Sequence, residues 1–121
     1  MIWPWDSRDE LSATANRAAE LAGIDARLTP DDIQFDGKYL GSAYGVPSDA
    51  GIEAMTLLAR TEGILLDHVY TAKAMAGLID HIRRGLFASN QDVVFVHTGG
   101  TPAVFADAEV LASRIARRTL G

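Results

Sequence analysis

The sequence contains no cysteine and few basic residues. Without cysteine, a chain of 121 residues has no disulfide framework, no thiolate zinc site and no cysteine nucleophile, and it suits a reducing compartment. Eleven Lys and Arg residues against sixteen Asp and Glu residues give a formal net charge of −5. Because this balance offers no basic surface to phosphate groups, nucleic acid and membrane surfaces are poor candidates for a partner.

Long apolar runs are missing as well. No run approaches the roughly 20 residues that cross a bilayer, and the short apolar start lacks the basic region of a secretory signal. We therefore expect a cytoplasmic protein. No repeat, low-complexity tract or Gly/Ser linker divides the sequence, and 48% of its residues are hydrophobic. Residues 1–121 are therefore expected to form a single domain with a buried core.

Helical periodicity appears in four segments. Ser7 and Glu10 have the spacing of a capping box, and Gly23 can end the helix that follows. Asp49 can cap a second helix, which Gly63 can end. The expected helices span residues 7–22, 48–62, 70–84 and 103–120.

Three short apolar runs alternate with these helices and are expected to be strands. They are residues 33–35, 64–66 and 93–96. The last run, VVFV, is continuous and rich in β-branched residues, which is typical of a strand buried on both faces of a parallel sheet. The alternation of helices and strands predicts an α/β layered fold with few strands.

Several residues could carry chemistry, and each also has an ordinary structural interpretation. The sequence Thr98-Gly99-Gly100 follows an expected strand, so it is either a tight turn, which we favour, or a ligand-facing loop. Tyr70 begins a helix and is either a packing ring or a stacking or catalytic residue. Lys73 lies one turn into that helix, where a solvated amine is expected.

Metal binding has no support in the sequence. The three histidines have no spacing to one another or to a carboxylate that resembles a metal site, so no metal is expected. The pair Trp3 and Trp5 fits either a hydrophobic staple or an exposed patch.

Four ordered motifs narrow the interpretation. They are residues 44–47 (YGVP), 58–67 (LARTEGILLD), 69–79 (VYTAKAMAGLI) and 97–103 (HTGGTPA). Together they resemble the C-terminal part of the D-cysteine desulfhydrase and 1-aminocyclopropane-1-carboxylate deaminase family, over about residues 39–106. The resemblance implies pyridoxal 5'-phosphate (PLP) as the cofactor. It also implies the tryptophan synthase β-subunit fold type. This chain would be the C-terminal part of that α/β fold, a partial layered parallel sheet with flanking helices.

The resemblance implies site residues position by position. Tyr70 matches a tyrosine that lies against the PLP ring and approaches the substrate, and Tyr44 matches a second active-site tyrosine, so both are expected to be catalytic. Thr71, Thr98 and Gly99 are expected to frame the cofactor together with Tyr70. Thr71 stands where the cyclopropane deaminases have a glutamate near the pyridine nitrogen, and Thr98 where they have a leucine. A hydroxyl stabilises a pyridinium less than a carboxylate does, which favours α,β-elimination over ring opening.

Two positions and the length depart from the family pattern. His68 replaces a proline, and Ala72 replaces a glycine. The Schiff-base lysine and the phosphate-binding loop belong to an N-terminal portion that these motifs do not include, and neither Lys38 nor Lys73 matches that lysine. The chain is therefore expected to be one partial domain that does not hold the cofactor covalently.

These expectations combine into one functional hypothesis. The chain resembles a C-terminal segment of a PLP-dependent lyase, truncated or encoded apart from its other half and inactive alone. Completed by an N-terminal half, it would convert a small D-amino acid to pyruvate, ammonia and sulfide. The alternatives are a non-catalytic remnant or protein-interaction module, and a 1-aminocyclopropane-1-carboxylate deaminase. An uncovered sheet edge predicts that the chain forms a homo-oligomer, most simply a symmetric dimer.

Overall fold

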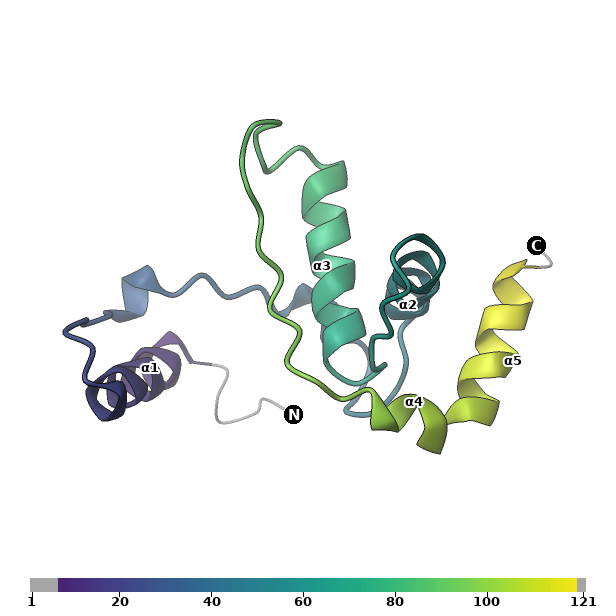
Figure 1. Cartoon of the computed structure of the whole chain (residues 1–121), viewed down its shortest axis with the longest axis horizontal. Helices are drawn as coiled ribbons and strands as arrows, with labels where there is room; N and C mark the ends of the chain where they lie inside the picture. The colour runs from purple at the N-terminus through teal and green to yellow at the C-terminus, as the bar shows by residue number, and fades with distance from the viewer. Residues whose placement is uncertain (1–6, 120–121) are drawn as a thin grey trace. The chain divides into compact units, whose positions relative to one another are not determined.

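The computed structural model describes residues 7–119, which form helices joined by loops (Figure 1). Trp3, Trp5 and the expected helix end at Leu120 lie outside this range. The chain divides into two compact units, Met1–Gly37 and Lys38–Gly121. Among the described residues, no helix is long and apolar enough to cross a membrane. The elements are α1 (Arg8–Ala22), the 3-10 helices η1 (Pro30–Asp32) and η2 (Gly37–Tyr39), α2 (Asp49–Thr61), α3 (Thr71–Arg83), α4 (Pro102–Ala106) and α5 (Ala108–Thr119).

In the first unit, the ends of α1 are those that the sequence predicts. The Ser7 side chain accepts a hydrogen bond from the Glu10 amide at 3.1 Å. At the other end Gly23 adopts φ +68°, a left-handed conformation that glycine adopts without a steric penalty. The side-chain amide of Asn16, in the middle of α1, donates to the Leu28 carbonyl at 2.9 Å and accepts from the Leu28 amide at 2.8 Å. This pair fastens the loop before η1 to the middle of α1.

In the second unit, α2 and α3 pack against each other and hold most of the core. The expected cap of α2 is wrong by one residue: Ser48, not Asp49, accepts the hydrogen bond from the Gly51 amide, at 3.1 Å. An added Cβ at Gly51 would lie 3.7 Å from the Ala72 Cβ, so small side chains allow the two helices to approach closely. The buried hydrophobic residues are Ile52, Ala54, Met55, Leu66, Ala72, Met75, Ala76 and Leu111.

The last expected helix is divided into two. A continuous helix over residues 103–120 is wrong because Asp107, with φ −108° and ψ 23°, lies outside the helical conformation and separates α4 from α5. The corner has a packing reason: it directs α5 against α2 and places Leu111 in the core, where it is 2% exposed.

The expected strands, and with them the partial parallel sheet, do not form among residues 7–119. Residues 92–96 instead belong to an extended loop that runs from the C-terminal end of α3 back toward its N-terminal end (Figure 1). The side chains of Val94 and Val96 are 85% and 72% exposed. A strand requires hydrogen bonds to a neighbouring strand, and no backbone hydrogen bond joins residues 92–96 to another described segment. The apolar run therefore shows strand propensity without a partner to pair with.

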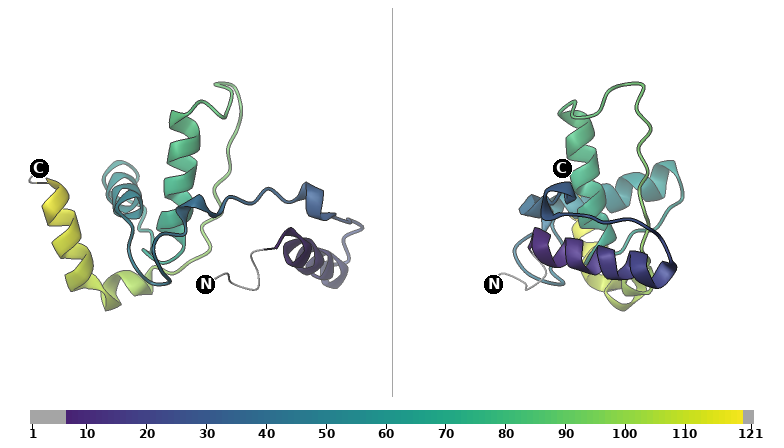
Figure 2. Two further views of the ribbon diagram at one scale, coloured as in Figure 1. Left: turned by 180° about the vertical axis from the view of Figure 1, so that it is seen from behind. Right: turned by 90° about the vertical axis from the view of Figure 1, so that its left-hand side faces the viewer.

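The loops of the second unit bring distant segments together at the start of α3. Figure 2 shows from two further sides that the chain passes from α3 through the long loop into α4. This return brings the segment after residue 96 next to the segment before α3, as the hydrogen bond between His97 and Leu65 shows.

Candidate functional site

Asp67 organises the beginning of α3. Its carboxylate accepts hydrogen bonds from the amides of Val69 and Tyr70, both at 2.8 Å, and from the amide of Thr71 at 2.9 Å. Burial by itself would raise the pKa of this carboxyl, which is 1% exposed, but the hydrogen bonds from Thr71 and the two preceding amides outweigh it and hold the pKa below its ordinary value. A carboxylate at a helix N-terminus also interacts favourably with the helix dipole. Asp67 is therefore ionised and rigidly held.

Thr71, an expected cofactor contact, is engaged with the same carboxylate. Its hydroxyl donates to Asp67 Oδ1 at 2.6 Å and accepts from the Asp67 amide at 2.9 Å. The residue is buried, and its single hydroxyl proton is directed toward Asp67. Toward any further group, Thr71 therefore presents an oxygen lone pair rather than a proton.

The two expected catalytic tyrosines meet. The hydroxyls of Tyr44 and Tyr70 lie 2.5 Å apart, and their rings pack edge to face with centroids 5.9 Å apart. Both side chains are largely exposed, at 62% and 58%. The hydrogen bond to Tyr44, followed by desolvation and the nearby Asp67 charge, raises the pKa of Tyr70 above its ordinary value. Tyr70 therefore keeps its proton at neutral pH, and both side chains remain open to a ligand.

Lys73 contradicts the expectation of a solvated amine. It is 7% exposed, and its ammonium donates to the backbone carbonyls of Leu40 at 2.7 Å and Ala43 at 3.3 Å. Burial lowers its pKa, and the Asp67 charge partly offsets that effect. The physical reason is topological: the turn at residues 40–43 folds over the first turn of α3 and brings carbonyl oxygens to the lysine.

The glycine-containing turn at residues 97–100 lies against Asp67. An added Cβ at Gly100, whose φ is +89°, would lie 2.6 Å from Asp67 Cγ, so only glycine fits there. His97 receives a hydrogen bond from the Gly99 amide at Nδ1 (3.2 Å), and its Nε2 lies 3.0 Å from the Leu65 carbonyl. Both contacts are satisfied by a neutral imidazole with the proton on Nε2.

The environment of this turn supports both interpretations that the sequence allowed. Gly100 is required for close packing, as in a tight turn. At Gly99, by contrast, an added Cβ would meet nothing within 4 Å, so the backbone there faces open space. Thr98 lies between the two anchored positions His97 and Gly100. The expected site residues thus come together around the start of α3.

The other histidines serve packing contacts. His68 is buried, with Nε2 3.4 Å from Asp107 Oδ2, and its Nδ1 has no hydrogen-bond partner among the described residues. His81 packs edge to face against Tyr39. Within residues 7–119, no group of three or more His, Asp or Glu side chains could hold a metal ion.

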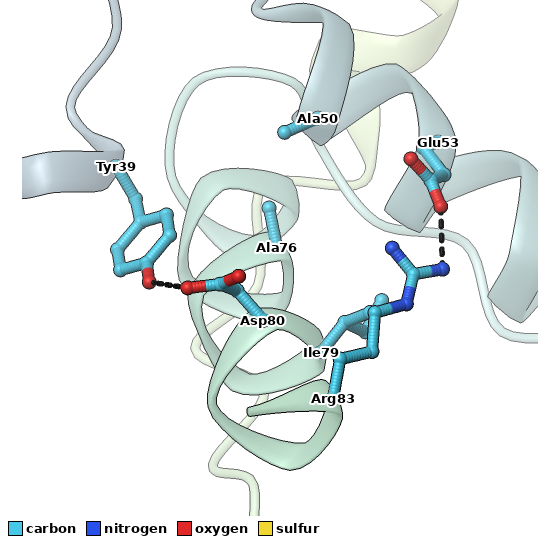
Figure 3. A pocket seen from close by; sticks show the side chains of 7 residues that line it. All are labelled: Tyr39, Ala50, Glu53, Ala76, Ile79, Asp80 and Arg83. Carbon is cyan, nitrogen blue, oxygen red and sulfur yellow. Dashed lines mark hydrogen bonds and ion pairs between the residues drawn. The ribbon is translucent and has the colours of Figure 1, made fainter. Parts of the chain in front are cut away.

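A hollow of about 170 Å³ lies beside the C-terminal half of α3, away from the tyrosine pair at its start (Figure 3). Its polar side chains already form pairs: the Tyr39 hydroxyl donates to Asp80 at 2.5 Å, and Arg83 contacts Glu53 at 2.6 Å. Small-molecule sites usually have volumes of roughly 300 to 1,000 Å³. The hollow is therefore a packing groove between α2 and α3 rather than a cofactor site.

Two important residues escaped the sequence-based prediction. Asp67 carried a usable signal, because an aspartate in the turn that leads into a helix commonly accepts hydrogen bonds from backbone amides a few residues later. The burial of Lys73 had no local signal, since its partners Leu40 and Ala43 lie more than 29 positions earlier and contribute only backbone atoms.

Comparisons with known proteins identify the family to which the chain belongs. The sequence matches the family described as "Pyridoxal-phosphate dependent enzyme" over residues 6–99. It is 40% identical over 107 residues to the 1-aminocyclopropane-1-carboxylate deaminase of Burkholderia vietnamiensis, covering 88% of this chain and 32% of that protein. It is 52% identical over 86 residues to the D-cysteine desulfhydrase of Salmonella typhi, covering 71% of this chain and 26% of that protein.

The fold matches a solved member of the same group. A crystal structure of a 1-aminocyclopropane-1-carboxylate deaminase homologue superposes with a TM-score of 0.69 and 32% sequence identity, over 87% of this chain and 30% of that one. The chain thus belongs to the family of PLP-dependent enzymes. Within that class it belongs to the group of 1-aminocyclopropane-1-carboxylate deaminase and D-cysteine desulfhydrase, and it spans about a third or less of the length of the relatives it matches, 26% to 32%.

Proposed function

We propose that this chain supplies one wall of a PLP site in a lyase that removes the β-substituent from a small D-amino acid. The supporting observation is the meeting of three segments at the start of α3. Tyr44 comes from the turn before α2 and Tyr70 from the end of the Asp67 loop. Gly99 comes from the turn after the extended segment, which is joined to the segment before α3 by the His97–Leu65 hydrogen bond and by the close approach of Gly100 to Asp67.

The residues at this place fit one side of the cofactor. The exposed Tyr70 ring offers a face for stacking on a pyridine ring, and the open space at Gly99 lets a ligand approach the backbone. Thr71 and Thr98 would lie beside the ring. When bound, PLP supplies the electron sink that makes the α-proton of an amino acid acidic.

The tyrosine pair would handle protons for the substrate. Because the hydroxyls of Tyr44 and Tyr70 share a hydrogen bond, one can donate to a substrate atom while the other restores the first hydroxyl. The raised pKa of Tyr70 keeps it a donor rather than a phenolate at neutral pH. Tyr70 would act nearest the reacting atoms, and Tyr44 would orient it.

Two threonines favour the desulfhydrase branch. Neither Thr71 nor Thr98 carries a carboxylate, so the pyridine nitrogen would lack an anionic partner in direct contact, which suits departure of a good leaving group such as sulfide. The 52% identity to the Salmonella typhi desulfhydrase, against 40% over a longer alignment to the deaminase, also supports this branch. A deaminase remains the competing outcome of the experiment below.

The Schiff-base amine and the phosphate anchor would come from a further part of the enzyme. We place the enzyme in the cytoplasm, a reducing compartment that a chain without cysteine suits. Lys73 is buried and bound to two carbonyls, so it is poorly placed to react with an aldehyde. Completion by an N-terminal half would then bring the amino-acid substrate to Tyr70.

A chimera tests this proposal. Residues 38–106 of this chain would replace the matching segment of the Salmonella typhi desulfhydrase, and both D-cysteine and 1-aminocyclopropane-1-carboxylate would be supplied. We expect pyruvate from D-cysteine, no 2-oxobutanoate from the cyclopropane, and loss of elimination on Tyr70→Phe. A folded, PLP-loaded chimera that opens the cyclopropane ring would assign the deaminase branch instead.

A second candidate function is supported by a separate observation. Val94 and Val96 are exposed on an extended segment that has no backbone hydrogen bond to another part of residues 7–119, as expected for a module that pairs with another chain. A chimera that binds PLP but turns over neither substrate would favour this interaction module.

A further inference from the structure

Lys73 is a buried cation of the second unit that the proposed chemistry does not use. It lies one turn after Tyr70, and its ammonium is bound by the Leu40 and Ala43 carbonyls at 2.7 and 3.3 Å. Burial of an ammonium is costly unless its hydrogen bonds are made, so these contacts hold the turn strongly.

The turn that Lys73 holds is the one that presents Tyr44. Ala43 precedes Tyr44 directly, and its carbonyl accepts from both Lys73 and the Val46 amide, so both flanks of Tyr44 are fixed. Gly41 completes the fit: an added Cβ would lie 3.3 Å from the Lys73 nitrogen, and its φ of +80° lets the chain turn there.

We infer that Lys73 is a positioning residue, whose ammonium fastens the 40–43 turn to α3 and thereby sets the hydrogen bond between Tyr44 and Tyr70. Both tyrosines are mostly exposed, so their own burial does little to hold them together. Two points on one rigid helix, Tyr70 at its start and Lys73 a turn later, define where Tyr44 lies. The catalytic meaning of this arrangement rests on the proposed function, but the arrangement itself does not.

The test uses the full chain without cofactor and replaces Lys73 by methionine, which keeps an unbranched side chain but removes the donors. Two readouts follow the turn directly. Hydrogen exchange of the Val46 amide should accelerate about tenfold or more, as expected for loss of a hydrogen bond to a charged group. In ¹³Cζ-tyrosine NMR, the titration of Tyr70 should move down toward that of an ordinary tyrosine, and we expect the same shift in Tyr44→Phe, which removes the hydrogen bond directly.

Lys38→Met is the matched control, because Lys38 is the other lysine of the chain and is exposed. It should leave both readouts unchanged. A folded Lys73→Met chain with wild-type Val46 exchange and wild-type Tyr70 titration would overturn the inference, and so would equal effects of both lysine substitutions.

Two further measurements apply if the methionine variant does not fold. Lys73→Gln keeps an N–H donor on a shorter side chain and should shift both readouts in the same direction by a smaller amount. In the unsubstituted chain, the Lys73 ammonium should exchange its protons slowly enough to give an ¹⁵N-detected signal; fast exchange would contradict the inference. None of these readouts involves PLP, so an inactive chimera would refute the proposed function without affecting this result.

Discussion

The α2–α3 pair and the extended segment at residues 92–96 have similar apolar character in the sequence but different outcomes in the structure. In the pair, Ile52 and Met75 are buried between two helices whose hydrogen bonds are internal. In the extended segment, Val94 and Val96 are exposed, although the sequence VVFV has the stronger apolar run.

The difference teaches how local and non-local structure are specified. A helix satisfies its backbone within one segment, so a periodic stripe and a cap are sufficient to define it. A strand satisfies its backbone only through a neighbour. The chain spans about a third or less of its relatives, and the exposed segment has no neighbouring strand among the described residues.

The largest effect should come from truncation inside the helical pair. Ile52→Ala removes a side chain that is 1% exposed, and should lower the free energy of unfolding by about 2 to 4 kcal/mol. Val94→Ala removes a side chain that makes little contact and should change it by less than about 0.5 kcal/mol. Urea denaturation followed by circular dichroism measures both. Equal losses would show that the extended segment is packed in solution.

The next effect concerns the start of α3. Asp67→Asn keeps the shape of the side chain, but an amide cannot accept from three backbone amides and the Thr71 hydroxyl at once. We expect a loss of about 1 to 3 kcal/mol in the same assay, because a buried donor is left without an acceptor. A variant as stable as the wild type would show that the hydrogen bonds to Asp67 do not stabilise the start of α3.

The same carboxylate predicts a dependence of stability on pH. Because the pKa of Asp67 is lower in the folded chain than its ordinary value of 3.8, its contribution is fully present above that value and disappears as the pH falls through the lower folded pKa. The difference in unfolding free energy between wild type and Asp67→Asn should therefore be constant at neutral pH and shrink in acid. A difference that grows in acid would contradict the sign of the shift.

Most of the helices could be predicted from the sequence, whereas the predicted sheet does not form among the described residues and the anchoring of Lys73 was not foreseen. Ser7, Gly23 and the pattern of α3 are local signals, and the family motifs identified Tyr44 and Tyr70, which lie within hydrogen-bonding distance. The corner at Asp107 and the burial of Lys73 depend on contacts with residues distant in the sequence. No local pattern encodes such contacts.

A smaller effect should appear in association rather than in stability. If the exposed segment pairs with a second copy, Val94→Lys with Val96→Lys should weaken self-association at least about tenfold, since charges on an exposed strand oppose edge pairing. Monomer stability should not change. Sedimentation equilibrium over a range of concentrations measures this, and a wild-type chain that is monomeric at every concentration would refute the expected homo-oligomer.

The smallest effect should come from α1, where the sequence and structure agree. Ser7→Ala removes the acceptor for the Glu10 amide at an exposed helix end and should cost about 0.5 to 1 kcal/mol of helix stability. Since α1 belongs to the first compact unit, hydrogen exchange should accelerate in residues 8–12 and remain unchanged in α3. Ser48→Ala, which removes the corresponding cap of α2, is the matched comparison. It should cost more than Ser7→Ala, because α2 is buried against α3 and cannot fray without exposing Ile52.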